Sequence, residues 1–112
     1  MNKTEQFEIL KDVDAKSNAL LLGKAQDYAT DDVLSNFKRL SSSINSIGIK
    51  INTPEGYALF MALMKIDRIN NLISNGKEPS NESIEDSFVD GINYLKLAYL
   101  CIKEKNDERE KV

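Results

Sequence analysis

Two helical segments of the chain place cations in the middle of apolar faces. When successive residues are set about 100° apart around a helix, Lys24 falls among apolar side chains within about 60° on either side. These side chains are Leu10, Val13, Leu20, Leu21 and Tyr28. An ammonium group on such a face either extends along the apolar surface to water or needs an anionic partner, which is a carboxylate or a phosphate.

The same pattern is stronger further along the chain, where Lys65 and Arg68 share one face. Their apolar neighbours on that face are Ala58, Met61, Ala62, Ile69 and Leu72. Because an unpaired buried charge costs several kcal/mol, both cations must have partners if this face is covered.

A polar ridge in the last quarter of the chain supplies candidate partners: Glu82, Asp86, Asp90 and Asn93 recur every three or four residues. The ridge has three interpretations. It is a solvated helix face, or Asp86 and Asp90 form buried salt bridges with Lys65 and Arg68 that fix the helix register, or these groups bind an anion directly or through a metal.

The elements that position these side chains are four predicted helices. The first runs from about residue 4 to 29, and the second from about 31 to 47, where Gly48 stops it. The third begins with the cap signal Thr53-Pro54-Glu55 and ends before Gly76. The fourth runs from about 81 to 106 with Ser83-x-x-Asp86 as its cap, and the charged end from about residue 103 is expected to be solvated. We therefore expect a single all-α domain over residues 1–112.

The fourth helix is apolar nearly all round in its second half. One side carries a predicted core stripe of Ile84, Phe88, Leu95, Ala98 and Ile102, and the opposite side carries Leu97, Leu100 and Cys101. Burial on several sides in so short a chain favours a subunit interface, so we expect a homo-oligomer.

Composition excludes several function classes. The 112 residues fit one small domain, and 15 Lys and Arg against 18 Asp and Glu give a net charge of −3, which does not favour binding to duplex nucleic acid. The chain has no histidine and a single cysteine, which excludes histidine-based catalytic pairs, an intramolecular disulfide and a cysteine zinc site. No continuous apolar stretch suggests a membrane span and the N-terminal residues are charged, so a cytoplasmic protein is expected.

The order of these motifs resembles that of small phage and prophage domains, some of them described as nucleotide-modification-associated, which look related to the all-α nucleotide pyrophosphohydrolases of the MazG and dimeric dUTPase type. The resemblance covers residues 22–97. The motifs are Lys24-x-x-Asp27-Tyr28, Asn36-Phe37, Met61-x-x-x-Lys65-x-x-Arg68 and Glu82-x-x-x-Asp86-x-x-x-Asp90-x-x-Asn93-Tyr94. The resemblance implies an oligomeric MazG-like four-helix bundle with a nucleotide phosphate site between helices.

The first functional hypothesis is a phage-type nucleotide-binding domain, acting in nucleotide metabolism or modification or sequestering a nucleotide signal in the host cytoplasm. Its expected ligand residues include cations for phosphate and aromatic side chains for the base. Lys24, Lys65 and Arg68 are the cations, Tyr28 and Phe37 the aromatic side chains, and Asp27, Asn36, Asn93 and Tyr94 complete the set.

Two alternatives remain open. In the first, the protein is a Mg²⁺-dependent nucleotide (pyro)phosphohydrolase, with Glu82, Asp86 and Asp90 as metal ligands. In the pyrophosphohydrolases a carboxylate pair faces this helix, whereas the third helix here offers Lys65, Asp67 and Arg68. In the second alternative, the protein is a non-catalytic interaction protein whose polar interior is structural. Whether the protein is an enzyme is thus left open by the sequence.

Overall fold

The computed structural model describes residues 1–28, 32–76, 78–79 and 83–110, and in the first of these ranges it describes side chains only up to residue 24. This part of the chain contains four helices and no strand, which confirms the all-α prediction. The helices are α1 (Lys3–Tyr28), α2 (Ser35–Ile47), α3 (Pro54–Asn75) and α4 (Ile84–Glu110). The predicted site residue Glu82 and the side chains of Asp27 and Tyr28 lie outside the described residues.

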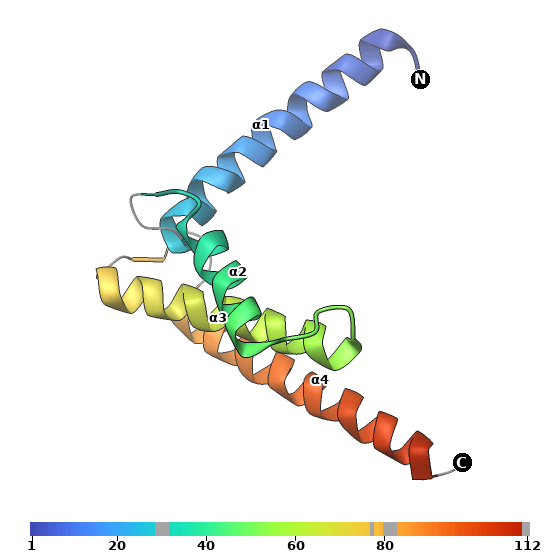
Figure 1. Ribbon diagram of the computed structural model, residues 1–112. Coiled ribbons are helices and arrows are strands. Elements are labelled where there is room, and N and C mark those ends of the chain that lie inside the picture. The colour runs from blue at the N-terminus through green and yellow to red at the C-terminus, as the bar shows by residue number, and fades with distance from the viewer. Residues whose placement is uncertain (29–31, 77, 80–82, 111–112) are drawn as a thin grey trace.

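The centre of the molecule is the pair α3 and α4, which lie against each other over much of their length (Figure 1). Small side chains make this close approach feasible, since Ala62 and Ala98 are buried in it together with Leu72. Gly91 of α4 lies next to Lys65 of α3, where an added Cβ would be 3.6 Å from the Lys65 Cβ. Helix α2 crosses α3 and buries Leu40.

The start of α3 follows the predicted cap. The Thr53 hydroxyl accepts a hydrogen bond from the Gly56 amide at 3.1 Å and donates one to the Lys50 carbonyl at 2.8 Å, and Pro54 occupies the first helical position. The helix ends at Gly76, whose φ of 60° is a left-handed conformation that favours glycine. Gly48 ends α2 in the same way, with a φ of 80°, as predicted.

Helix α2 begins at Ser35, four residues later than predicted. Asp32 forms a turn before it, because its carboxylate accepts the Leu34 amide at 2.9 Å and its carbonyl accepts the Ser35 amide at 2.9 Å. The carboxylate also pairs with Lys38 at 2.5 Å. The hydrogen bond from Lys38, together with that from the Leu34 amide, lowers the pKa of Asp32.

Helix α4 extends to Glu110, beyond the predicted end near 106. The charged run continues the helix because Lys103 pairs with Asp107 one turn later at 3.2 Å, and Lys105 pairs with Glu55 at the start of α3 at 3.2 Å. The helix therefore runs further than predicted, while the charged side chains from residue 103 are largely exposed.

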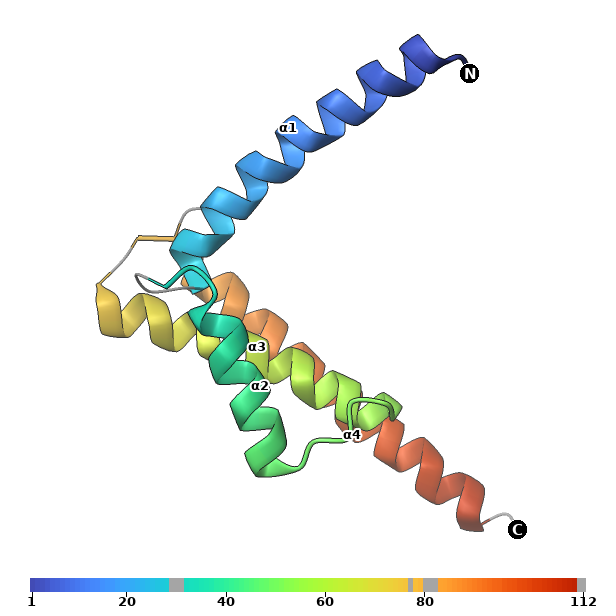
Figure 2. The same ribbon diagram turned by 45° about the horizontal axis from the view of Figure 1, so that its top comes forward.

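Helix α1 does not pack alongside the other three helices within one chain. In both views it leaves them at its C-terminal end and extends away (Figures 1 and 2). Its predicted apolar stripe of Leu10, Val13, Leu20 and Leu21 is between 52% and 63% exposed. The predicted core stripe of α4 is also only partly buried: Ala98 is buried, but Phe88, Leu95 and Ile102 face outward.

No helix in the described part of the chain is both long enough and apolar enough to cross a membrane.

Candidate functional site

A cavity of about 520 Å³ lies where the C-terminal end of α1 meets the start of α2 and the middle of α3. We call it the α1–α2 pocket, and its lining residues are Leu21, Leu22, Lys24, Val33, Leu34, Asn36, Phe37 and Met64. Its volume is in the range of cavities that hold small organic ligands, and its lining is mostly apolar with few polar groups, as such sites usually are. Three residues of the predicted ligand set, Lys24, Asn36 and Phe37, are brought together here.

Asn36 is the buried polar group of this pocket. Its residue is only 6% exposed, and no described residue donates a hydrogen bond to its side chain or accepts one from it. The amide oxygen and nitrogen of Asn36 are not fully enclosed, because Arg68 Nε is the only completely buried side-chain polar atom that lacks a hydrogen bond in the described part of the chain. Such a group in a cavity wall is therefore poised to bond to a ligand that carries both a donor and an acceptor.

Lys24 and Phe37 lie at more open positions of the same pocket. Lys24 is exposed, and no described carboxylate lies within ion-pair distance of its ammonium group. The Phe37 ring is 63% exposed, so a large part of its surface is open to contact. The pocket thus combines an apolar wall, a buried amide, an open aromatic ring and a cation at the rim.

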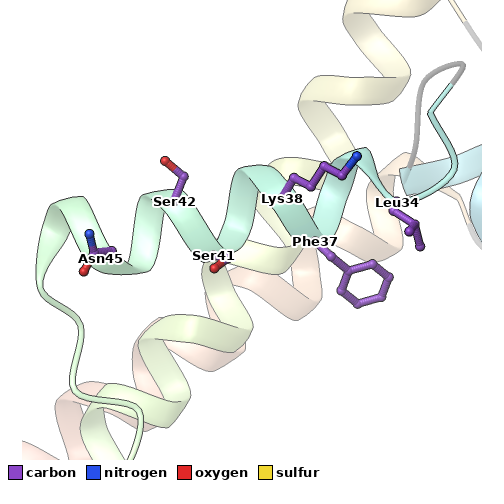
Figure 3. A pocket seen from close by; sticks show the side chains of 6 residues that line it. All are labelled: Leu34, Phe37, Lys38, Ser41, Ser42 and Asn45. Carbon is purple, nitrogen blue, oxygen red and sulfur yellow. The ribbon is translucent and has the colours of Figure 1, made fainter.

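A second hollow of about 730 Å³ follows the exposed side of α2 (Figure 3). Leu34 and Phe37 extend from the start of the helix and belong to both hollows, while Ser41, Ser42 and Asn45 continue along it (Figure 3). Asn45 and both serines are exposed, so this hollow has no buried polar group to orient a ligand. Of the serine run, Ser41 and Ser42 lie on an exposed helix face, and Ser43 is half-buried.

The other two predicted cations lie between α3 and α4 and do not line the α1–α2 pocket. The Lys65 ammonium pairs with the Asp90 carboxylate at 3.3 Å, and the Lys65 side chain is 14% exposed. Arg68 is fully buried and donates to the Ser83 carbonyl at 3.3 Å and to the Ser87 hydroxyl. The Lys65–Asp90 pair agrees with the interpretation in which salt bridges fix the register of two helices, whereas Arg68 bonds to a carbonyl and a hydroxyl in place of a carboxylate.

The predicted metal ligands within the described residues already have protein partners. The Asp86 carboxylate accepts the Ser83 amide at 3.2 Å while the Asp86 amide donates to the Ser83 hydroxyl at 3.1 Å, which is the predicted reciprocal cap of α4. Asp90 is paired with Lys65. Among the described residues no group of three or more histidine, cysteine or acidic side chains is arranged to hold a metal ion.

Asn93 and Tyr94, the last two predicted ligand residues, lie on α4, where Asn93 is exposed and Tyr94 half-buried. Neither lines the α1–α2 pocket. The structure therefore separates the predicted set into a pocket group and a group on the α3–α4 pair.

Two features of the structure were missed by the sequence analysis. Arg39 and Asp67 form a bidentate ion pair, in which Arg39 Nε donates to Asp67 Oδ1 at 2.8 Å and Nη2 donates to Oδ2 at 3.0 Å. This hydrogen bonding raises the pKa of Arg39. No sequence signal links residues 28 positions apart in this way. The second feature is Met64, which lines the pocket. The run Leu20-Leu21-Leu22, which is too apolar for one helix face, was the available signal for an apolar wall.

Comparison of the chain with protein-family models, with curated proteins and with solved structures gave no match. The chemistry of the site therefore follows from its own residues.

Proposed function

We propose that this protein is a nucleotide-binding domain whose α1–α2 pocket holds the base. The observation that carries the proposal is Asn36, a residue only 6% exposed in the wall of a mostly apolar cavity, whose side-chain amide has no partner among the described residues and is still accessible. An asparagine amide presents a donor and an acceptor side by side, which matches the paired donor and acceptor on the edge of a nucleobase.

The other pocket residues fit the remaining parts of a nucleotide. The open face of Phe37 suits a planar base, because stacking on an aromatic ring contributes about 1–3 kcal/mol. Lys24 at the rim suits a phosphate as a point charge. The order of the motifs supports a phage-type domain of the nucleotide-modification-associated class, acting in nucleotide metabolism or modification or sequestering a nucleotide signal in the host cytoplasm.

The test is a thermal-shift screen of nucleosides and nucleotides, cyclic dinucleotides included, on the parent chain and on Asn36→Leu. A ligand that binds only the native state raises the melting temperature by mass action, so we expect a rise with the parent chain. Asn36→Leu removes the amide that orients the ligand and should abolish the rise. The same substitution replaces an amide that has no partner among the described residues by an apolar group of similar size, so the free variant should melt close to the parent temperature.

Asn45→Leu is the matched control, because Asn45 lies on the same helix but outside the α1–α2 pocket. This variant should respond to the ligand as the parent chain does. Lys24→Ala should weaken binding of a nucleotide more than binding of its nucleoside. If no member of the panel shifts the parent chain, or if Asn36→Leu responds as the parent does, the pocket does not bind a base.

Incubating the same nucleotides with the protein and Mg²⁺, and measuring hydrolysis, distinguishes the hydrolase alternative from a binding domain. For metal binding, Asp86 would have to leave the α4 cap and Asp90 would have to leave Lys65. Turnover that Asp90→Asn abolishes would establish the hydrolase, whereas binding without turnover would establish a binding domain. If neither binding nor turnover is found, the non-catalytic interaction protein remains, with Lys65–Asp90 and Arg68–Ser87 as its structural polar interior.

A further inference from the structure

The chain exposes far more surface than a compact protein of its mass. Its accessible surface is 8303 Å², against about 6,200 Å² expected for a compact monomer of 12.6 kDa, an excess of about 2,100 Å². Its radius of gyration is 18.3 Å, against about 13 Å expected for 112 residues. The difference has a visible origin, because α1 and the C-terminal half of α4 diverge from each other (Figure 2).

Helix α4 carries two stripes with the same spacing. The first faces α3 and consists of buried and half-buried residues: Ser87, Gly91, Tyr94, Ala98 and Cys101. The second, which we call the α4 outer stripe, is 42% to 64% exposed and consists of Phe88, Ile92, Leu95, Tyr99 and Ile102. Steps of four and three residues are those of a helix that packs against another helix along a coiled-coil-like seam, so the α4 outer stripe has the pattern of a packed face without a partner in the chain.

Helix α1 also carries an apolar stripe that no other described helix of the chain covers. Its apolar stripe follows the steps of three and four residues through Leu10, Val13, Ser17 and Leu20, and the apolar members are more than half exposed. The two helices also match in length, with 26 residues in α1 and 27 in α4. Each helix therefore has an exposed apolar stripe that the other could cover.

We propose that a second copy of this chain covers both stripes, with α1 of each copy lying along the α4 outer stripe of its partner. This two-fold arrangement is closed, because each copy contributes one helix of each kind. Burying the excess surface of both copies would remove about 4,200 Å² from water, which is within the range of about 2,000–5,000 Å² for obligate homodimers. The proposal does not depend on the function of the α1–α2 pocket.

The first test is the mass in solution, measured by light scattering during size-exclusion chromatography. The parent chain should have twice its 12.6 kDa mass, and the double variant Leu95→Lys, Tyr99→Lys should be a monomer. Both substituted side chains are more than half exposed in the single chain, so the helices should form as before, which far-UV circular dichroism checks. Ile66→Lys is the control: Ile66 is also 55% exposed but lies on α3, so this variant should remain a dimer.

The second test identifies which helices meet. One chain carries Cys101→Ser and Ser17→Cys, and another carries Cys101→Ser and Lys96→Cys, so that the cysteines mark the middles of α1 and α4 whichever way the helices run. A flexible bismaleimide should join unlike chains when the two are mixed. A monomeric parent chain, cross-links only between like chains, or a cross-link within one chain that carries both cysteines would overturn the proposal.

Discussion

Arg68 is a fully buried charge on α3 whose side chain bonds to residues at the start of α4. Its guanidinium reaches the Ser83 carbonyl and the Ser87 hydroxyl, so one side chain joins the middle of α3 to the start of α4. A planar guanidinium with several fixed donors can serve two acceptors at once, in a geometry that the compact ammonium group of lysine does not reproduce. The cation is therefore part of the packing between the two helices.

Arg68→Lys should lower the free energy of unfolding by about 1–3 kcal/mol, because it keeps the charge but leaves a buried acceptor without its donor. Arg39→Lys is the matched comparison: the Arg39 side chain is 40% exposed, and its pairing with Asp67 should be worth less than about 1 kcal/mol. Urea unfolding measures both variants. Equal losses would mean that the Arg68 contacts do not hold α3 against α4.

At this scale the sequence predicted which side chains need partners but not which partners they find. Lys65 and Arg68 were expected to meet carboxylates of α4, and Lys65 does meet Asp90. Arg68 instead meets a serine hydroxyl and a carbonyl, while Asp86 caps its own helix. Helical spacing gives the face on which a residue lies, but the relative height of two helices depends on packing that no single segment encodes.

Among the helices, α3 has a close contact between Gly56 in its first turn and the loop that precedes the helix. An added Cβ at Gly56 would lie 1.8 Å from the Lys50 carbonyl oxygen and 2.7 Å from the Thr53 hydroxyl oxygen. The chain entering α3 thus passes so close to the helix that only glycine fits. The sequence identified this start from Thr53 and Pro54, but the need for glycine at position 56 came from the path of the preceding loop.

Gly56→Ala and Gly91→Ala should change stability in opposite directions. At Gly56 the methyl group must displace backbone and break the cap, so we expect a loss of about 1–3 kcal/mol or more. At Gly91 the nearest atom, the Lys65 Cβ, would be 3.6 Å away, an ordinary contact. There alanine should stabilise α4 by about 0.5–1 kcal/mol through its higher helix propensity. Thermal unfolding of the two variants measures both effects, and a stabilised Gly56→Ala would contradict this account of the loop.

The helices themselves were predictable because their ends carry local signals, such as the Ser83 and Asp86 cap and the stops at Gly48 and Gly76. The start of α2 was not, because Asp32 uses its side chain to form a turn where a helix N-terminus was expected. The end of α4 was placed too early because a charged run was taken as the end of the helix, although its exposed charges pair along the helix and with Glu55.

At the scale of the whole molecule, the position of α1 decides the shape. Four helices were expected to share one bundle, but a stripe of apolar residues shows only that a helix packs, and it does not show whether the partner belongs to the same chain. Exposure along α1 was therefore beyond the reach of sequence patterns. For α4 the pattern did indicate apolar surface in excess of one core, but it assigned Phe88, Leu95 and Ile102 to the core, whereas they are exposed.

Amide hydrogen exchange should distinguish α1 in the parent chain from α1 in the monomeric double variant Leu95→Lys, Tyr99→Lys. In the parent dimer the amides of residues 5–20 should be protected because the helix is packed. In the variant they should exchange faster, since an isolated helix without tertiary contacts opens readily, while α3 should keep its protection. Fast exchange of α1 in both proteins would show that nothing covers it.

Leu21 and Leu22 belong to the pocket wall and to the same continuous helix as Phe7, which lies about 21 Å away along the axis. If a partner that binds the far end of α1 changed the tilt of the helix, Leu21 and Leu22 would move with it. A ligand of the cavity that preferred one tilt would then change the affinity for that partner, and the partner would change the affinity for the ligand by the same factor.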